Sequence, residues 1–234
     1  MRAILFTGGI YHDFDRMSAA TAGILSSAGM KVEIVAQPED LVAALERQPT
    51  NLLVVQALRW RMLGNDKYEP FRDEWAYETG QDLIDAVTAH VSGGGGVLSL
   101  HTGCICFDDW PGWRAILGGG WVWGESFHAP GLEPVRVTPL PGHPVTEGIA
   151  PFTVTDEHYR NLALDPRSIV LAEGVAEAGI GHPVAWAKPG KERAGRAVTL
   201  TTGHDLASLT VPGQARFIRQ AALWAARQDG EETA

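Results

Sequence analysis

Short apolar runs alternate with helix-like segments through the N-terminal part of the chain, and this alternation restricts the fold more than any other feature. The apolar runs have the length and composition of buried strands, and they stand at residues 2–7, 31–36, 52–56 and 97–100. The intervening segments repeat apolar residues at helical spacing, at residues 17–28, 38–47 and 81–92. Strands that alternate with helices form a parallel sheet with helices on both faces, because their crossover connections are right-handed. We therefore expect an α/β fold.

The rest of the chain adds further strands and a closing helix. Further strand candidates lie at residues 135–138, 152–155, 169–172, 184–187 and 197–201. Residues 214–227 have the spacing of an amphipathic helix, whereas residues 57–80 mix aromatic and charged types without a period and predict a long loop that carries functional side chains. No repeat or linker divides the chain, so we predict a single domain over residues 1–228 and a frayed polar tail at 229–234.

The charge balance argues against several classes of partner. The chain has 19 basic and 28 acidic residues, for a net charge of −9, and no basic cluster to release counterions from a nucleic acid. No apolar stretch is long enough to span a membrane, and the N-terminal residues lack the pattern of a signal peptide. We expect a cytoplasmic protein with no nucleic-acid or membrane partner; a homo-oligomer stays open.

Histidines and a carboxylate follow the apolar runs. In doubly wound sheets, ligands bind outside the carboxyl ends of the strands. His12 follows the first strand, His101 the fourth and His204 the last, while the motif Asp-Glu-His-Tyr at 156–159 follows the run at 152–155. We expect His12, His101, Glu157 and His204 to converge at one edge of the sheet.

The segment that leads to His101 has the layout of a nucleophile elbow. It consists of a glycine-rich entry, a buried strand, one polar residue and a sharp turn, in the order Gly-Gly-Gly-Val-Leu-Ser-Leu-His-Thr-Gly (94–103). An imidazole cannot form the thioester that glutamine hydrolysis needs, and Cys104 lies three residues beyond the polar position. We therefore expect no glutaminase activity.

Several motifs together resemble the ThuA-like (trehalose-utilisation) family, over most of the chain up to Trp224. They are the elbow at 94–103, Trp-Pro at 110–111 with Gly-Gly-Gly at 118–120, His-Pro-Val-Thr-Glu-Gly-Ile at 143–149, Asp-Glu-His-Tyr at 156–159, His-Pro-Val-Ala-Trp at 182–186, and Gly-His at 203–204. The resemblance implies a flavodoxin-like fold of the class I glutamine amidotransferase type and a role in carbohydrate metabolism. His101 stands where those amidotransferases carry their cysteine. A departure is the segment 121–128, where relatives place a histidine sooner after the glycines.

The histidine set favours acid/base chemistry, with or without a metal. Imidazole titrates near neutral pH, so His101, with Glu157 and His204 beside it, suits a hydrolase, lyase or isomerase acting on trehalose or a keto-sugar derivative. Imidazole and carboxylate also suit a divalent ion of Zn, Mn, Fe or Ni, although none of the spacings is a zinc signature. The sequence leaves open whether a metal binds.

Aromatic residues near the expected cleft are candidates for binding a carbohydrate substrate. Tryptophan faces stack on the C–H surfaces of sugars, but core packing or a subunit interface would use the same residues. The candidate substrate-binding residues are His12, Trp60, Trp121, Glu125, His128, His158 and Tyr159. Two alternatives remain: a non-catalytic sugar-binding or assembly module, and a hydrolase that uses Cys104 or Cys106.

Overall fold

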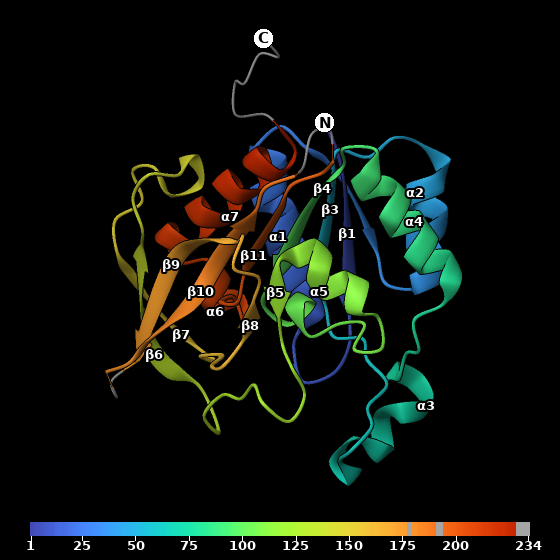
Figure 1. Ribbon diagram of the computed structural model, residues 1–234, viewed down its shortest axis with the longest axis horizontal. Coiled ribbons are helices and arrows are strands. Elements are labelled where there is room, and N and C mark those ends of the chain that lie inside the picture. The colour runs from blue at the N-terminus through green and yellow to red at the C-terminus, as the bar shows by residue number, and fades with distance from the viewer. Residues whose placement is uncertain (177–178, 191–193, 228–234) are drawn as a thin grey trace.

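In this computed structural model, which describes residues 1–176, 179–190 and 194–227, a nine-stranded sheet runs through the molecule (Figure 1). Its first five strands pair in parallel, in the order β2 (Lys31–Val35), β1 (Arg2–Gly8), β3 (Leu52–Ala57), β4 (Gly96–Leu100) and β11 (Ala197–Leu200). Strands β1, β3, β4 and β11 are buried at almost every residue. Burial on both faces explains why these strands read as continuous apolar runs.

The sheet continues in antiparallel strands beyond β11. Their order is β10 (Gly181–Lys188), β9 (Ile169–Ala176), β6 (Glu133–Pro139) and β7 (Phe152–Asp156). Antiparallel neighbours can be joined by short turns, whereas parallel neighbours need a crossover of a dozen or more residues. Between β6 and β11, the described residues form no helix other than the short 3₁₀ helix η3 (Pro144–Thr146), so no helical crossover joins these strands and neighbouring strands run in opposite directions. The expected α/β class is confirmed, and the sheet is mixed.

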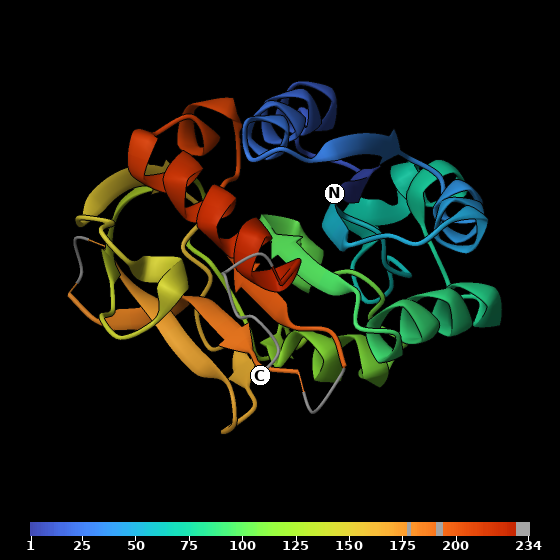
Figure 2. The same ribbon diagram turned by 90° about the horizontal axis from the view of Figure 1, so that it is seen from above.

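Helices cover both faces of the sheet, and Figure 2 shows α1 and α7 on one side with α4 and α5 on the other. One face carries α1 (Phe14–Ser27), α6 (Leu206–Leu209) and α7 (Pro212–Ala225), and the other carries α2 (Pro38–Arg47), α4 (Gln81–Ser92) and α5 (Pro111–Leu117). Alternate strand residues feed the two cores: Leu5 and Val54 join the α1 and α7 side, and Phe6 and Val55 the opposite side. Alternation along a strand therefore gives this sheet two hydrophobic cores.

The remaining elements are short and lie near the ends of the strands. They are η1 (Asp66–Phe71), α3 (Arg72–Trp75), η2 (His101–Cys104), and a two-stranded ribbon of β5 (Gly119–Gly120) and β8 (Ala163–Leu164). The helices expected at residues 38–47 and 81–92 have those bounds in the structure. The segment at 57–80, expected to be a loop, contains η1 and α3.

Two further expectations concern membrane-spanning helices and the C-terminal tail. None of the helices in the described residues is long and apolar enough to cross a membrane. The polar tail expected at 229–234 lies outside the described residues.

Candidate functional site

The polar residue of the elbow, His101, occupies the sharp turn at which β4 ends and η2 begins. Its φ is 48°, in the left-handed region that residues with a side chain rarely adopt, and its side chain is fully buried. Its Nδ1 lies 2.8 Å from the carbonyl oxygen of Thr201, at the end of β11. At Gly103, a Cβ would lie 2.3 Å from the carbonyl oxygen of Val55, so the turn needs glycine there. The backbone thus fixes His101 and directs its Nε2 toward the carboxyl edge of the sheet.

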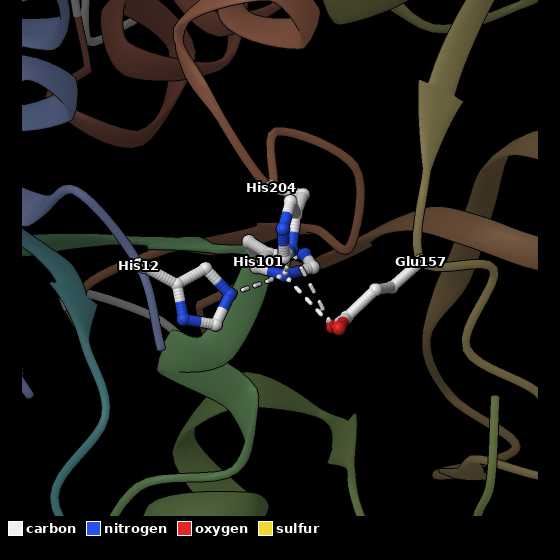
Figure 3. A group of neighbouring side chains, drawn as sticks. All are labelled: His12, His101, Glu157 and His204. Atoms are coloured by element: carbon white, nitrogen blue, oxygen red, sulfur yellow. Dashed lines mark hydrogen bonds and ion pairs between the residues drawn. The ribbon is translucent and has the colours of Figure 1, made fainter. Parts of the chain in front are cut away.

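Four polar atoms surround the Nε2 atom of His101. Figure 3 shows three of the side chains involved, His12, Glu157 and His204, around His101. The distances from His101 Nε2 are 3.1 Å to His12 Nε2, 3.0 Å to the Tyr159 hydroxyl, 3.3 Å to His204 Nδ1 and 3.4 Å to Glu157 Oε2. The convergence expected from the strand ends is therefore present in the structure. We refer to His12, His101, Glu157 and His204 as the His-Glu cluster.

Each member of the His-Glu cluster comes from a different strand end. His12 follows β1, and its Nδ1 lies 3.0 Å from the carbonyl oxygen of Ile10. Glu157 follows β7, and His204 follows β11. The ends of parallel β1, β4 and β11 meet at one edge because parallel strands end on the same side. Strand β7 pairs antiparallel with β6, but four successive antiparallel pairings from β11 give it the same direction as β11, so Glu157 follows a strand that ends at the same edge.

Asp156, which the sequence offered only as part of a motif, holds the loop that carries His204. This side chain is fully buried. Its Oδ2 accepts hydrogen bonds from the backbone N–H of Gly203 at 2.7 Å and of His204 at 3.3 Å, and from the Ser208 hydroxyl. Its Oδ1 accepts from the backbone N–H of Glu157 at 3.0 Å. Asp156 is therefore a positioning residue that ties β7 to the loop after β11.

Burial and neighbouring charges shift the pKa values of the cluster residues in different directions. Burial and the nearby charge of His101 lower the pKa of His12 to about 3. Burial alone would lower the pKa of His101, but its hydrogen bond with Glu157 and the charge of Asp156 outweigh burial and raise it. Burial would raise the pKa of Glu157, but hydrogen bonds from His101 and His204 hold it well below its usual range. Glu157 is thus an ionised carboxylate in a region that attracts positive charge.

A cavity of about 210 Å³ opens above the His-Glu cluster. His12, Glu157 and His204 line it together with Tyr159, whereas His101 lies beneath them and does not line the cavity. The walls contain the aromatic side chains of Tyr11, Trp60, Tyr68, Trp121, Trp123 and Tyr159, together with Leu58, Lys67, Thr102, Ile105 and His128. Any group that links His101 to a ligand must therefore lie between this histidine and the cavity floor.

Most of the substrate-binding candidates lie on this cavity, but two do not. Trp60, Trp121, His128 and Tyr159 line it, as does His12. His158 is a correction, because its buried ring packs against the ring of His182, with centroids 5.3 Å apart, and does not line the cavity. Glu125 is a second correction: its side chain is exposed and does not line the cavity, and its backbone bonds to Val122 and Asn161.

Seven further residues line the cavity that were not among the candidates from the sequence: Tyr11, Leu58, Lys67, Tyr68, Thr102, Ile105 and Trp123. Lys67 and Tyr68 come from η1, within the segment at 57–80 that was expected to carry functional side chains. Trp123 is 41% exposed at the mouth, and its ring stacks on Trp60 with centroids 5.7 Å apart. The signal for Tyr68 and Trp123 was the density of aromatic residues in irregular segments, which does not by itself say which of them face a ligand.

The two cysteines are poorly suited to nucleophilic chemistry. Cys104 and Cys106 are 4% and 3% exposed, and neither forms a disulfide. Cys106 donates its S–H to the carbonyl oxygen of Ala57 at 3.1 Å, and burial raises its pKa to about 12. The thiolate is the nucleophilic form, so this environment argues against the hydrolase alternative that uses a cysteine.

Comparisons with known proteins identify a family and several structures of the same fold. The model of a family described as trehalose utilisation (ThuA) matches residues 2–225. A ThuA-like protein from Parabacteroides merdae superposes with a TM-score of 0.75 at 18% identity, over 100% of this chain and 92% of its own. A ThuA-like protein from Bacteroides uniformis gives 0.70 at 16% identity, over 96% and 91%.

A third structure, a cytoplasmic protein from Salmonella typhimurium, gives a TM-score of 0.61 at 13% identity, over 95% of this chain and 98% of its own. No curated protein matches the chain significantly. At these identities the solved structures establish the fold.

Proposed function

Because the chain belongs to the ThuA family of trehalose utilisation, we propose that it is a cytoplasmic enzyme of carbohydrate metabolism that acts on trehalose or a keto-sugar derivative at the His-Glu cluster. The observation that carries this proposal is the convergence of four polar atoms on the Nε2 of one buried histidine, at the floor of an aromatic cavity. Packing does not require such a convergence, since each buried polar group costs free energy unless it is paired.

The size and lining of the cavity favour a sugar unit as its occupant. A volume of about 210 Å³ corresponds to roughly seven water molecules, which suits a small polar ligand rather than a long chain. Ligand sites combine apolar and aromatic walls with a few polar groups that fix orientation. Here the partly exposed Trp121 and Trp123 offer aromatic surface for the C–H groups of a sugar, while Trp60 is buried and supports Trp123 by stacking on it. Glu157 and His204 line the same cavity and can bond to the sugar hydroxyls.

The residues at the cavity floor supply both proton acceptors and a proton donor. The Glu157 carboxylate can only accept a hydrogen bond, whereas the Tyr159 hydroxyl can donate one and lies 3.3 Å from Glu157 Oε2. A sugar oxygen placed at this floor would meet both groups together with His204. This set supports a reaction that moves a proton to or from a sugar oxygen or its neighbouring carbon, as hydrolases, lyases and isomerases do. Glutamine hydrolysis is not proposed, because His101 replaces the nucleophile.

The proposal is tested by incubating the purified protein with trehalose, other disaccharides and their keto derivatives. Products are followed by ¹³C NMR, and binding is measured in parallel by calorimetry. We expect chemical conversion of at least one of these sugars. Binding without conversion would instead establish the non-catalytic sugar-binding module. The absence of both binding and conversion would contradict the enzyme and the sugar-binding module alike.

A further inference from the structure

We propose that the His-Glu cluster holds one divalent first-row transition-metal ion, coordinated by His12, His101, Glu157 and His204. This inference deepens the proposed function, on which it rests for the identity of the substrate, but the metal site itself is argued from the geometry of the four side chains. The ion would lie between the buried His101 and the cavity floor, which the other three residues line.

The separations of the donor atoms fit a metal ion. Ligand nitrogens lie about 2.0–2.1 Å from Zn²⁺, so neighbouring donors around a tetrahedral ion are about 3.3 Å apart, and around an octahedral ion about 3.0 Å. His101 Nε2 lies 3.1 Å from His12 Nε2, 3.3 Å from His204 Nδ1 and 3.4 Å from Glu157 Oε2. One donor atom from each of the four residues lies within 4.8 Å of every other, so a small closing movement completes the ligand set.

The hydrogen bonds behind two of the histidines turn their acceptor atoms toward each other. A carbonyl oxygen can only accept, so Nδ1 of His101 donates to Thr201 at 2.8 Å, and Nδ1 of His12 donates to Ile10 at 3.0 Å. In the neutral imidazoles both Nε2 atoms then carry a lone pair, and they face each other at 3.1 Å. Two acceptors do not bond to each other, so a cation bound between the neutral rings would satisfy both and would take the place of a proton on His101.

The same hydrogen bonds are those that metal-binding histidines use in other proteins. A ligating imidazole usually donates its second N–H to a backbone carbonyl or carboxylate, which fixes the tautomer and the ring orientation. Thr201 and Ile10 supply those carbonyls here, and Asp156 anchors the loop of His204 through the backbone N–H groups of Gly203 and His204. The structure therefore contains the outer support of a metal site as well as its ligands.

The donor set selects the class of ion. Three imidazole nitrogens and one carboxylate oxygen suit Zn²⁺, Mn²⁺, Fe²⁺, Co²⁺ or Ni²⁺, whereas Mg²⁺ and Ca²⁺ prefer ligands that are all oxygen. Such an ion acts as a Lewis acid toward a carbonyl or hydroxyl oxygen. A sugar that enters from the cavity would present an oxygen to it, with Tyr159 beside the ion to donate a proton.

The site is tested by metal titration. The protein is purified without a histidine tag and freed of metal with a chelator. Co²⁺ and Zn²⁺ are titrated by calorimetry, and Co²⁺ also by its visible absorption. We expect one ion per chain. The His12→Ala and His204→Ala variants should lose more affinity than the roughly 10–100-fold that removal of an outer hydrogen-bond partner costs. The His182→Ala variant, which alters a histidine outside the cluster, should bind as the wild type does.

Both cluster variants change partly exposed residues, so folding is checked by their thermal unfolding, and His101→Gln is added as the deepest ligand. The proposal is overturned if neither Co²⁺ nor Zn²⁺ binds, or if binding is the same in the wild type and the cluster variants. The result is independent of sugar turnover. Conversion of a sugar by a protein that binds no metal would contradict the metal site and leave the proposed function standing, while metal binding without any conversion would support the site and contradict the proposed function.

Discussion

The Glu157→Gln protein is expected to convert its sugar substrate about 10²–10⁴-fold more slowly than the wild type, the range that loss of a positioned acid or base produces. The change keeps the size of the side chain and removes its charge. Glu157 Oε2 contacts both His101, at 3.4 Å, and the Tyr159 hydroxyl, at 3.3 Å, and the side chain lines the cavity. A neutral amide there cannot accept a proton or neutralise a cation.

The matched control for this variant is Glu125→Gln. Glu125 is exposed, and its side chain does not line the cavity, so its loss should leave kcat/KM within about twofold of the wild type, as for a surface change away from the site. Initial rates at several substrate concentrations give kcat and KM for both variants. Equal activity of Glu157→Gln and the wild type would show that the carboxylate has no part in the reaction.

The Asp156→Ala protein is expected to lose about 3–5 kcal/mol of its free energy of unfolding. Removal of this buried carboxylate leaves the N–H groups of Gly203 and His204 and the hydroxyl of Ser208 without their acceptor. Each buried donor without a partner costs about 1–3 kcal/mol, and the loss compares with a total stability of about 5–15 kcal/mol. The loop of His204 should also lose its fixed position, so the affinity of the cluster for Co²⁺ should fall.

Denaturant unfolding followed by circular dichroism measures this change, with Asp205→Ala as the control. Asp205 caps α6 through one hydrogen bond to the backbone N–H of Ser208 at 2.8 Å, and loss of such a cap costs about 1 kcal/mol. If both alanine variants lost the same free energy of unfolding, the four hydrogen bonds of Asp156 would stabilise the protein no more than the single cap of Asp205. The positioning role of Asp156 would then be wrong.

The parallel half of the sheet could be predicted from the sequence because burial leaves a direct mark there. Strands β3 and β4 are buried at every residue, so they appear as unbroken apolar runs. The direction of β6, β7, β9 and β10 could not be predicted in the same way, since it depends on the connections between the strands and not on their composition. Helix α5 was missed although Pro111 begins it and Gly118, with φ of 73°, ends it, which is a recognisable pair of signals.

The candidate site, like the sheet, could be predicted from the sequence only in part. His12, His101 and His204 were found because the ends of parallel strands meet at one edge of the sheet. His158 was placed wrongly because it lies between two residues that face the cavity. Glu157 and Tyr159 contact His101, and the side chain between them points the other way toward His182, as expected for an extended chain. The role of Asp156 depends on Gly203, 47 residues away, and no local pattern reveals such a contact.

The central claim, that the His-Glu cluster binds and acts on a sugar, is tested most directly by a crystal structure of the protein with the sugar that it binds most tightly. We expect a sugar oxygen in contact with the cluster, either through an ion held by the four residues or directly at Glu157 and His204, with the sugar ring against Trp121 and Trp123. A sugar seated instead against Trp110 and Arg114, in the neighbouring cavity of about 360 Å³, with the cluster untouched, would contradict it.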